Sequence, residues 1–180
     1  MTPSSVLLLP GRDAATARHW LALWQHKFGY MRIEQHEWRR PLRGDWQIRL
    51  EDELSDRSEP VLFVAHDLGC WLVAAWAATS RHTHKVAGAL LVAPCDVHVE
   101  PARTQLRSWQ TTPIRPLPFT SVLVASANDP QCALDRAAEL AGLWGAQFID
   151  HGQSGHIDAQ ASLGSWPEGH VLLQGLMTLQ

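Results

Sequence analysis

Short apolar runs recur along the chain and predict buried β-strands. Four of these runs are almost entirely apolar: Val6–Leu9, Val61–Ala65, Val86–Ala93 and Ser121–Ser126. Consecutive apolar positions are typical of parallel strands that are covered on both faces of a sheet. Gln147–Asp150 is expected to be a short last strand, and Met31–Glu37, where apolar and polar residues alternate, is expected to be an edge strand.

Between these runs, apolar residues recur at helical spacing. We expect helices over Ala14–Lys27, Gly44–Leu54, Trp71–Ala78 and Ala133–Trp144, and a C-terminal helix opened by Trp166-Pro167-Glu168-Gly169. Asp13 stands where an N-cap would begin the first helix. Pro41–Gly44 is expected to form a turn. The proline-rich stretch His98–Pro118 predicts a long and partly irregular excursion.

Strands that alternate with helices, without hairpin turns between them, predict an α/β fold. We expect a three-layer α/β/α sandwich with a mainly parallel sheet, formed by residues 1–180 as a single domain. In such sheets ligands bind beyond the carboxyl ends of the strands. Four titratable residues follow predicted strand ends and are therefore expected at one crevice: Asp13, Asp67, Asp129 and His156.

Composition narrows the class of protein. Hydrophobic residues make up 46% and charged residues 18% of the 180 residues, which is typical of a globular protein. A formal charge of −3 without a basic stripe argues against a nucleic-acid partner, and no apolar run is long enough for a signal peptide or a membrane helix. Arg39, Arg40 and Arg43 are expected in a solvated loop.

The three cysteines, Cys70, Cys95 and Cys132, are odd in number and far apart, so we expect reduced thiols in a cytoplasmic protein. His82 and His84 have basic neighbours, so we expect them to face solvent rather than bind a metal. No metal is predicted. Glycine-rich nucleotide motifs are absent from the sequence, and no cofactor is expected.

The stretch from Ala65 to Gly69 predicts the reactive centre. Its sequence, Ala65-His66-Asp67-Leu68-Gly69, lies between a buried strand and an apolar helix, and small residues flank a reactive one. This is the layout of a nucleophile elbow, usually written G-x-S-x-G. The turn would lift Asp67 to the top of the sheet and direct free N–H groups of the helix toward the atom it attacks.

Asp67, Asp129 and His156 stand in the chain order of an α/β-hydrolase triad, which is nucleophile, acid and histidine. Each follows a different predicted strand. Asp150 and Asp158 are alternatives to Asp129 as the acid, but both lie close to His156 in the sequence. Ser154, in Gly152-Gln153-Ser154-Gly155, has no apolar strand before it and is expected to be a loop residue.

The chain resembles the small serine-hydrolase family of retinoblastoma-binding protein 9 and YdeN, which are α/β-hydrolases without a cap domain. The similar segments are Leu9-Pro10-Gly11, His19-Trp20, Asp45-Trp46, His66-Asp67-Leu68-Gly69-Cys70, Gly88-Ala89-Leu90-Leu91-Val92-Ala93-Pro94, Pro116-Leu117-Pro118-Phe119, Ala125-Ser126-Ala127-Asn128-Asp129-Pro130, Gly155-His156-Ile157 and Trp166-Pro167-Glu168-Gly169. The resemblance implies that Asp129 is the triad acid and His156 the base. It also implies an oxyanion hole from backbone N–H groups of Leu68 and of the Gly11-Arg12 loop. The chain departs from the family at Asp67, where the family has serine, and at Ala65, where it has glycine.

An aspartate at the elbow changes the chemistry that is expected. A carboxylate is already ionised at neutral pH, so it can attack directly and leave the histidine to activate water. Attack on an ester carbonyl suits it poorly, because a carboxylate leaves more readily than an alkoxide. Attack on saturated carbon, as in haloalkane dehalogenases and epoxide hydrolases, suits it better. Residues considered for stabilising the leaving group are Trp20, Trp71, Trp109 and Tyr30, although a packing role is expected for the tryptophans.

Three interpretations follow from the sequence. The protein is a hydrolase that cleaves an ester or a carbon–leaving-group bond in a small molecule through Asp67, Asp129 and His156. Alternatively, the site has decayed, Asp67 and His156 form a buried ion pair, and the fold binds a ligand or a protein partner. In the third interpretation, Asp67 was introduced into a serine enzyme.

Overall fold

Six parallel strands form the centre of the fold. The structure is a computed structural model that describes residues 5–12 and 16–178. The strands are β1 (Ser5–Leu9), β2 (Met31–Arg32), β3 (Val61–His66), β4 (Val86–Val92), β5 (Thr120–Ala125) and β6 (Gln147–Asp150). They lie in the order β2-β1-β3-β4-β5-β6, and each neighbouring pair is parallel. The central strands bring Leu9 opposite Ala65 and His66 opposite Val92, at the carboxyl edge.

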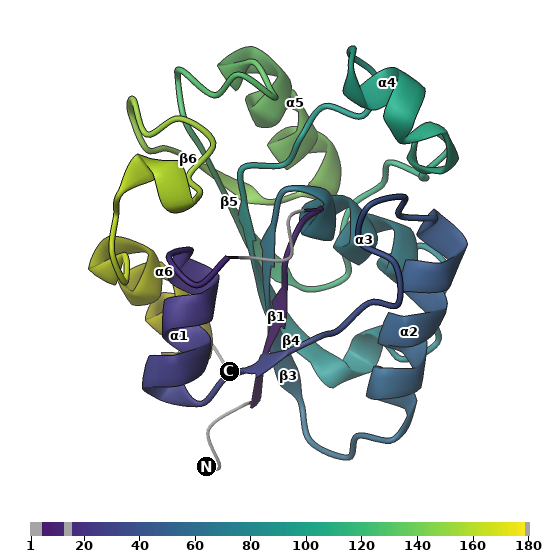
Figure 1. Cartoon of the computed structure of the whole chain (residues 1–180). Helices are drawn as coiled ribbons and strands as arrows, with labels where there is room; N and C mark the ends of the chain where they lie inside the picture. Colours follow the sequence, from purple (N-terminus) through teal and green to yellow (C-terminus); the bar gives the residue numbers. More distant parts are fainter. Residues whose placement is uncertain (1–4, 13–15, 179–180) are drawn as a thin grey trace.

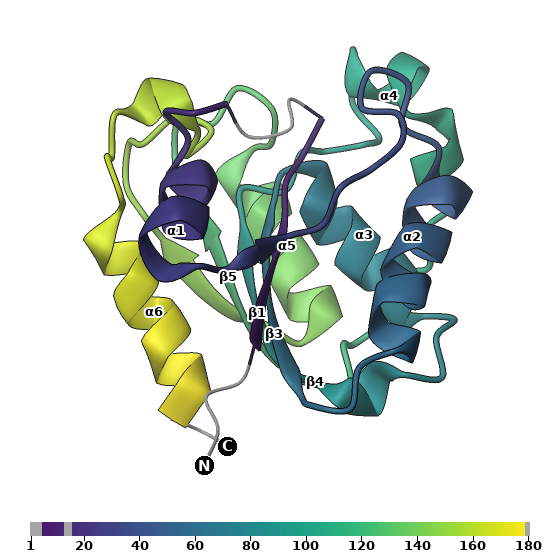
Figure 2. The ribbon, with the colours of Figure 1, turned by 60° about the horizontal axis from the view of Figure 1, so that its bottom comes forward.

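Helices cover both faces of the sheet. They are α1 (Trp20–Phe28), α2 (Arg43–Ser55), α3 (Leu68–Ala77), α4 (Ala102–Gln105), α5 (Leu134–Trp144) and α6 (Pro167–Thr178). Figures 1 and 2 show α1 and α6 on one side of the sheet and α2 and α3 on the other. The side chains of α5 belong to the same core cluster as those of α2 and α3. This arrangement confirms the predicted three-layer α/β fold.

Alternating side chains of each central strand enter two separate cores. Leu7 and Phe63 pack with the residues of α2, α3 and α5, whereas Leu8 and Val64 pack with α1 and α6. Because both faces of the sheet are covered, every position of β3 is buried. The continuous apolar runs in the sequence therefore reflect burial on two sides.

The first helix differs from its prediction. It begins at Trp20 instead of Ala14, and His19 is its N-cap, with Nδ1 accepting a hydrogen bond from the Leu21 N–H at 3.1 Å. Asp13, the predicted N-cap, lies outside the described residues. The predicted edge strand is also shorter, since β2 ends at Arg32. Conversely, α3 begins at Leu68, earlier than predicted, directly after the elbow residue.

The remaining segments largely follow the sequence pattern. The excursion over 98–118 is irregular except for α4 and a 3₁₀ turn at Arg107–Trp109. The predicted arginine loop is only partly correct, because Arg43 is the first residue of α2. Within residues 5–12 and 16–178, no helix is long and apolar enough to cross a membrane.

Candidate active site

The turn at Asp67 joins β3 to α3 in a strained backbone conformation. Asp67 has φ 53° and ψ −121°, values that side-chain-bearing residues rarely adopt and that cluster at functional sites. The turn also needs small neighbours. A Cβ on Gly69 would collide with the Leu9 carbonyl oxygen, and a Cβ on Gly11 would collide with the Asp67 side chain. Close packing of β1, β3 and α3 therefore explains the glycines around the elbow.

Three loops bring Asp67, His156 and Asp129 into contact. His156 Nε2 lies 3.4 Å from Asp67 Oδ1, and His156 Nδ1 lies 2.9 Å from Asp129 Oδ2 and 3.0 Å from its Oδ1. Asp129 Oδ1 also accepts the Gln131 N–H at 2.8 Å, which holds the carboxylate in place. The side chains of Asp67, His156 and Asp129 are 8%, 6% and 2% exposed. The three residues are thus linked in space, with the His156 ring between the carboxylates of Asp67 and Asp129.

The two oxygens of the Asp67 carboxylate have different surroundings. Oδ2 accepts the Arg12 backbone N–H at 3.2 Å and lies 3.5 Å from Arg12 Nε. Oδ1 makes no hydrogen bond with the described residues, and neither does His156 Nε2, the atom that faces it. A relaxed charge-assisted N–H···O bond would be about 2.7–2.9 Å long. The 3.4 Å between Oδ1 and Nε2 is therefore longer than such a bond.

Electrostatics fix the charge state of this pair. Burial lowers the pKa of His156, but the hydrogen bond to Asp129 and the charge of Asp67 outweigh it and raise the pKa to about 9. Burial raises the pKa of Asp67, but His156 and the Arg12 guanidinium outweigh it and hold that pKa well below its usual range. At pH 7 the pair is an imidazolium and a carboxylate.

Two neutral histidines surround the triad, and sequence reasoning assigned neither of them a role. His66 Nε2 donates a hydrogen bond to the His156 carbonyl at 2.9 Å, and burial lowers the pKa of His66 to about 4. Burial likewise lowers the pKa of His19 to about 2, and its ring lies 4.6 Å from that of His66. The signal that could have indicated His66 is a polar residue at the end of an otherwise apolar strand. His19 and His66 therefore line the cavity beside Asp67 and His156 with uncharged rings.

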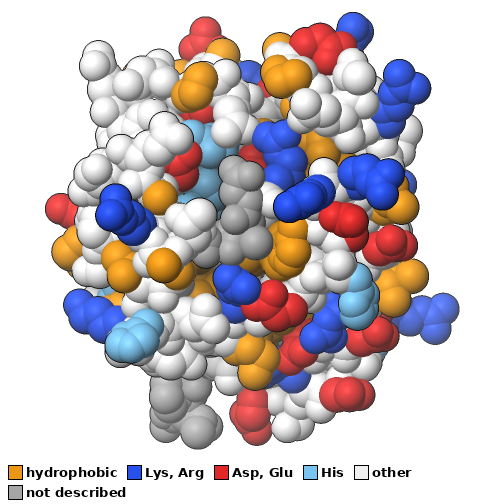
Figure 3. Space-filling view, in the orientation of Figure 1, with side chains coloured by type: hydrophobic (Ala, Val, Ile, Leu, Met, Phe, Trp, Pro, Cys, Tyr) orange, Lys and Arg blue, Asp and Glu red, His pale blue; other side chains and the backbone are white. Residues whose placement is uncertain are grey.

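Two cavities lie beside Asp67. The first, of about 340 Å³, is lined by Gly11, Thr16, His19, His66, Asp67, His156, Asp158, Ala159 and Gln160. The second, of about 620 Å³, is bounded by residues of α4, of the loop after β5 and of the Trp38–Arg39 segment, and Arg12 also lines it. Figure 3 shows histidine surface in a hollow of this face, with Lys and Arg side chains gathered beside it. Asp67 therefore borders one cavity directly and contacts the other through Arg12.

The oxyanion donors implied by the resemblance lie near the carboxylate. The Arg12 N–H reaches Asp67 Oδ2, and Leu68, as the first residue of α3, has an N–H without an acceptor inside the helix. Gly11 lines the smaller cavity beside Asp67. The Arg12 guanidinium, which the sequence did not single out, adds a positive charge at the same oxygen.

The alternative residues have other partners, although Asp158 also lines the smaller cavity. Asp150 accepts the Gly152 N–H, Asp158 caps a 3₁₀ turn, and Ser154 is a loop residue whose hydroxyl contacts His151. Cys70 is a free cysteine that is buried in α3. His82 is partly exposed, and Glu51 Oε1 lies 2.8 Å from its Nδ1, an acidic neighbour that the local sequence did not indicate. Across the part of the chain that is described, no group of three His, Cys, Asp or Glu could hold a metal ion.

The tryptophans considered for leaving-group stabilisation are core residues. The indole N–H groups of Trp20, Trp71 and Trp109 donate to the carbonyls of Ile157, Cys95 and Pro41 at 2.8, 2.6 and 2.9 Å. All three side chains are buried. Tyr30 lies away from the triad, with its hydroxyl 2.9 Å from His170 Nε2. Each of these groups already has a partner.

Comparison with known proteins agrees with the fold. The family model described as serine hydrolase matches residues 6–175. A YdeN-like hydrolase from Pectobacterium atrosepticum is 27% identical, with a TM-score of 0.85 over 97% of this chain and 91% of that one. The YdeN product of B. subtilis is 18% identical, with a TM-score of 0.78 over 97% and 99% of the two chains. Est1E from Butyrivibrio proteoclasticus, solved with ferulic acid, shares the fold at 11% identity and a TM-score of 0.73, over 95% of this chain and 88% of that one. No curated protein matches the sequence.

Proposed function

Because the chain belongs to the serine hydrolase family, we propose that it is a hydrolase in which Asp67 replaces the family's serine as nucleophile. In this proposal His156 is the base, Asp129 orients His156, and the substrate is a small molecule attacked at a saturated carbon. The reaction passes through an ester of the substrate on Asp67. The cytoplasmic location stays a prediction.

The unequal surroundings of the two Asp67 oxygens are the observation that carries this proposal. Arg12 holds Oδ2 through its backbone N–H, whereas Oδ1 has no hydrogen bond and faces His156 Nε2 across 3.4 Å. An Asp nucleophile needs this division, because one oxygen attacks while the other must later carry negative charge next to N–H donors. Oδ1 is the attacking oxygen in this assignment.

In the first step, Asp67 Oδ1 gives an electron pair to the substrate carbon, and the leaving group departs with the bonding pair. Asp67 then becomes an uncharged ester, so His156 loses the anion that helps to raise its pKa. The proton of His156 goes to an alkoxide leaving group, such as that of an opened epoxide, or to solvent when the leaving group is a halide. His156 is left neutral and able to act as a base.

In the second step, neutral His156 takes a proton from water, and the hydroxide adds to Cγ of the ester. The negative charge develops on Oδ2, where the Arg12 N–H already points. The adduct collapses to release the alcohol, which takes a proton from His156. The remaining carboxyl proton passes to His156, which restores the ion pair and leaves one water oxygen in Asp67.

A trapping experiment tests this function. In His156→Gln the first step is retained and the second is blocked, so incubation with small epoxides and alkyl halides should leave an adduct on the peptide that contains Asp67. Mass spectrometry detects the added mass. The double variant Asp67→Asn/His156→Gln is the control and should stay unmodified. An adduct on another residue, or equal labelling of the double variant, would contradict the proposal.

The decayed site is the second candidate, and the burial of the Asp67–His156 pair favours it. Two opposite charges with side chains 8% and 6% exposed are also what a purely structural ion pair would show. Asp67→Ser distinguishes the two candidates. If only this variant hydrolyses p-nitrophenyl acetate and the wild-type protein gives no adduct, the site is a former serine site.

A further inference from the structure

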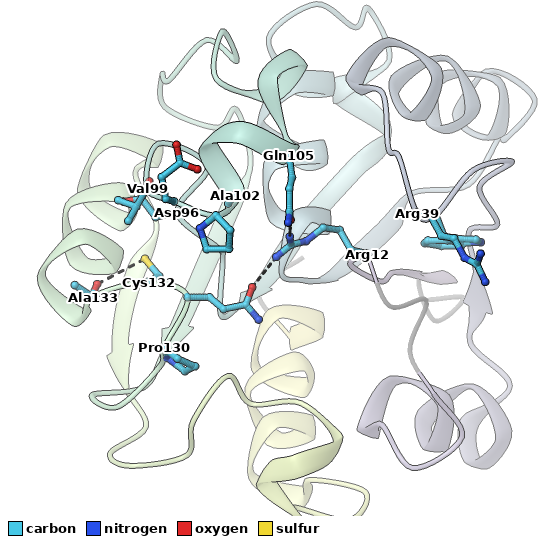
Figure 4. A pocket seen from close by; sticks show the side chains of 13 residues that line it. Arg12, Arg39, Asp96, Val99, Ala102, Gln105, Pro130, Cys132 and Ala133 are labelled. Atoms are coloured by element: carbon cyan, nitrogen blue, oxygen red, sulfur yellow. Dashed lines mark hydrogen bonds between the residues drawn. The ribbon is translucent and has the colours of Figure 1, made fainter.

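The larger cavity has an excess of unused hydrogen-bond donors. Arg12 lines it, and its Nη1 contacts Gln105 Oε1 at 3.4 Å and its Nη2 contacts Gln131 Oε1 at 2.7 Å (Figure 4). Each terminal guanidinium nitrogen carries two N–H groups, and these contacts use one of each. Both glutamine oxygens accept from Arg12, so both side-chain NH₂ groups are left to donate. Among the described residues neither NH₂ group has an acceptor.

The acidic residues of this cavity already contact cations and N–H donors. Asp96 accepts the His98 N–H at 3.0 Å and lies 3.5 Å from Arg136 Nε. Glu100 accepts from Arg103 Nε at 2.9 Å and from Thr104. Glu100 therefore has a cationic partner, and Asp96 shares Arg136 with Glu139, whose Oε2 lies 2.6 Å from Arg136 Nη1. The guanidinium of Arg39, by contrast, has no ion-pair partner among the described residues, and it stands toward one side of the cavity in Figure 4.

Apolar side chains complete the wall. They are Trp38, Val99, Pro101, Ala102, Pro130 and Cys132. An occupant must therefore combine hydrogen-bond acceptors and negative charge with a small apolar body. A carboxylate offers acceptor sites in the plane that a guanidinium fork and two amide NH₂ groups can meet.

We propose that this 620 Å³ cavity binds the carboxylate of a small organic acid through Arg12, Gln105 and Gln131, with the charge of Arg39 at the edge of the cavity adding attraction. The inference rests on the proposed function only where it identifies the bound organic acid as the substrate of that reaction. Arg12 links the two parts of the site, because its Nε lies 3.5 Å from Asp67 Oδ2. A carboxylate bound at its terminal nitrogens is thereby held next to the nucleophile.

Calorimetric titration of the intact protein tests this inference with benzoate and butyrate as probes, and with benzamide and butyramide as uncharged controls. We expect the acids to bind and the amides to bind at least about tenfold more weakly. Gln131→Glu keeps the oxygen that accepts from Arg12 but replaces the NH₂ donor by a negative charge, so it should abolish binding of both acids. Circular dichroism checks that the variant is folded.

Arg39→Gln and Arg40→Gln form a matched pair, because they remove the same charge from neighbouring exposed positions and only Arg39 lines the cavity. Arg39→Gln should weaken benzoate binding about fivefold, and Arg40→Gln should change it less than about twofold. Equal binding of acids and amides, or equal effects of the two arginine variants, would overturn the inference. These binding measurements need no turnover. If benzoate and butyrate do not bind but the adduct on Asp67 forms in the trapping experiment, only this inference is refuted. If the acids bind but no adduct forms, only the covalent mechanism is refuted.

Discussion

Gly69→Ala is expected to destabilise the protein by about 3 kcal/mol or more. The new Cβ would collide with the Leu9 carbonyl oxygen and would lie 3.3 Å from the Pro10 oxygen. Both neighbours are backbone atoms at the end of β1, which is held on both sides by hydrogen-bonded strands. The strain cannot be relieved by a side-chain rotation, so α3 must move away from β1. Urea unfolding followed by tryptophan fluorescence measures the loss.

Gly142→Ala is the matched control for this prediction. Gly142 is also a helical glycine, in α5, but a Cβ there would meet no atom within 4 Å. Alanine favours the helix over glycine, so this variant should be more stable by roughly 0.5–1 kcal/mol. Similar effects of the two substitutions would show that helix propensity, and not the close approach at the elbow, governs position 69.

The central strands, including the one that leads into the elbow, were predictable because their burial produces a recognisable pattern in the sequence. Strands covered on both faces must be continuously apolar, so β3, β4 and β5 were located to within about a residue. The start of α1 was misplaced for a physical reason. His19 supplies the capping atom through its ring, and a histidine is not among the residues that normally signal an N-cap.

The contacts among Asp67, His156 and Asp129 were likewise predictable only in part. The carboxyl ends of parallel strands meet at one edge, so Asp67, Asp129 and His156 were expected together, and the structure places them in contact. The glutamines that hold Arg12 come from α4 and from the loop after β5, at sequence separations of 93 and 119. Such contacts depend on the course of irregular loops, which carry no periodic signal. Chemistry on strand ends can be read from a sequence, but the walls of a pocket cannot.

The stability of the protein is expected to fall by roughly 2 kcal/mol between pH 7 and pH 9.5 because of His156 alone. The folded-state pKa of His156 is raised from 6.5 to about 9 by Asp129 and Asp67, against burial. The folded state therefore holds a proton that the unfolded chain has already lost. This contribution is complete below pH 6.5, persists through neutral pH, and disappears as the pH rises through about 9. Urea unfolding at a series of pH values measures it.

Other groups titrate near pH 7–9.5. The loss of stability must therefore be compared between the wild type and a variant that lacks His156. Burial raises the pKa of Cys70, Cys95 and Cys132, which adds an alkaline loss of its own. His19 and His66 have lowered pKa values and act mainly below pH 7. All five groups remain in His156→Gln, so subtracting its pH profile isolates His156.

The Asp67→Asn variant tests whether Asp67 helps to raise the pKa of His156. Its pH profile of stability should lie between those of the wild type and His156→Gln. The substitution removes one of the two carboxylates that raise the pKa of His156 and keeps Asp129, whose two oxygens lie 2.9 and 3.0 Å from Nδ1. The alkaline loss should therefore become smaller and move to lower pH, without vanishing. If the profile of Asp67→Asn matches the wild type, Asp67 exerts no pull on the His156 proton. The proposed change of His156 from acid to base, which needs that pull to end when Asp67 is esterified, would then have no physical basis.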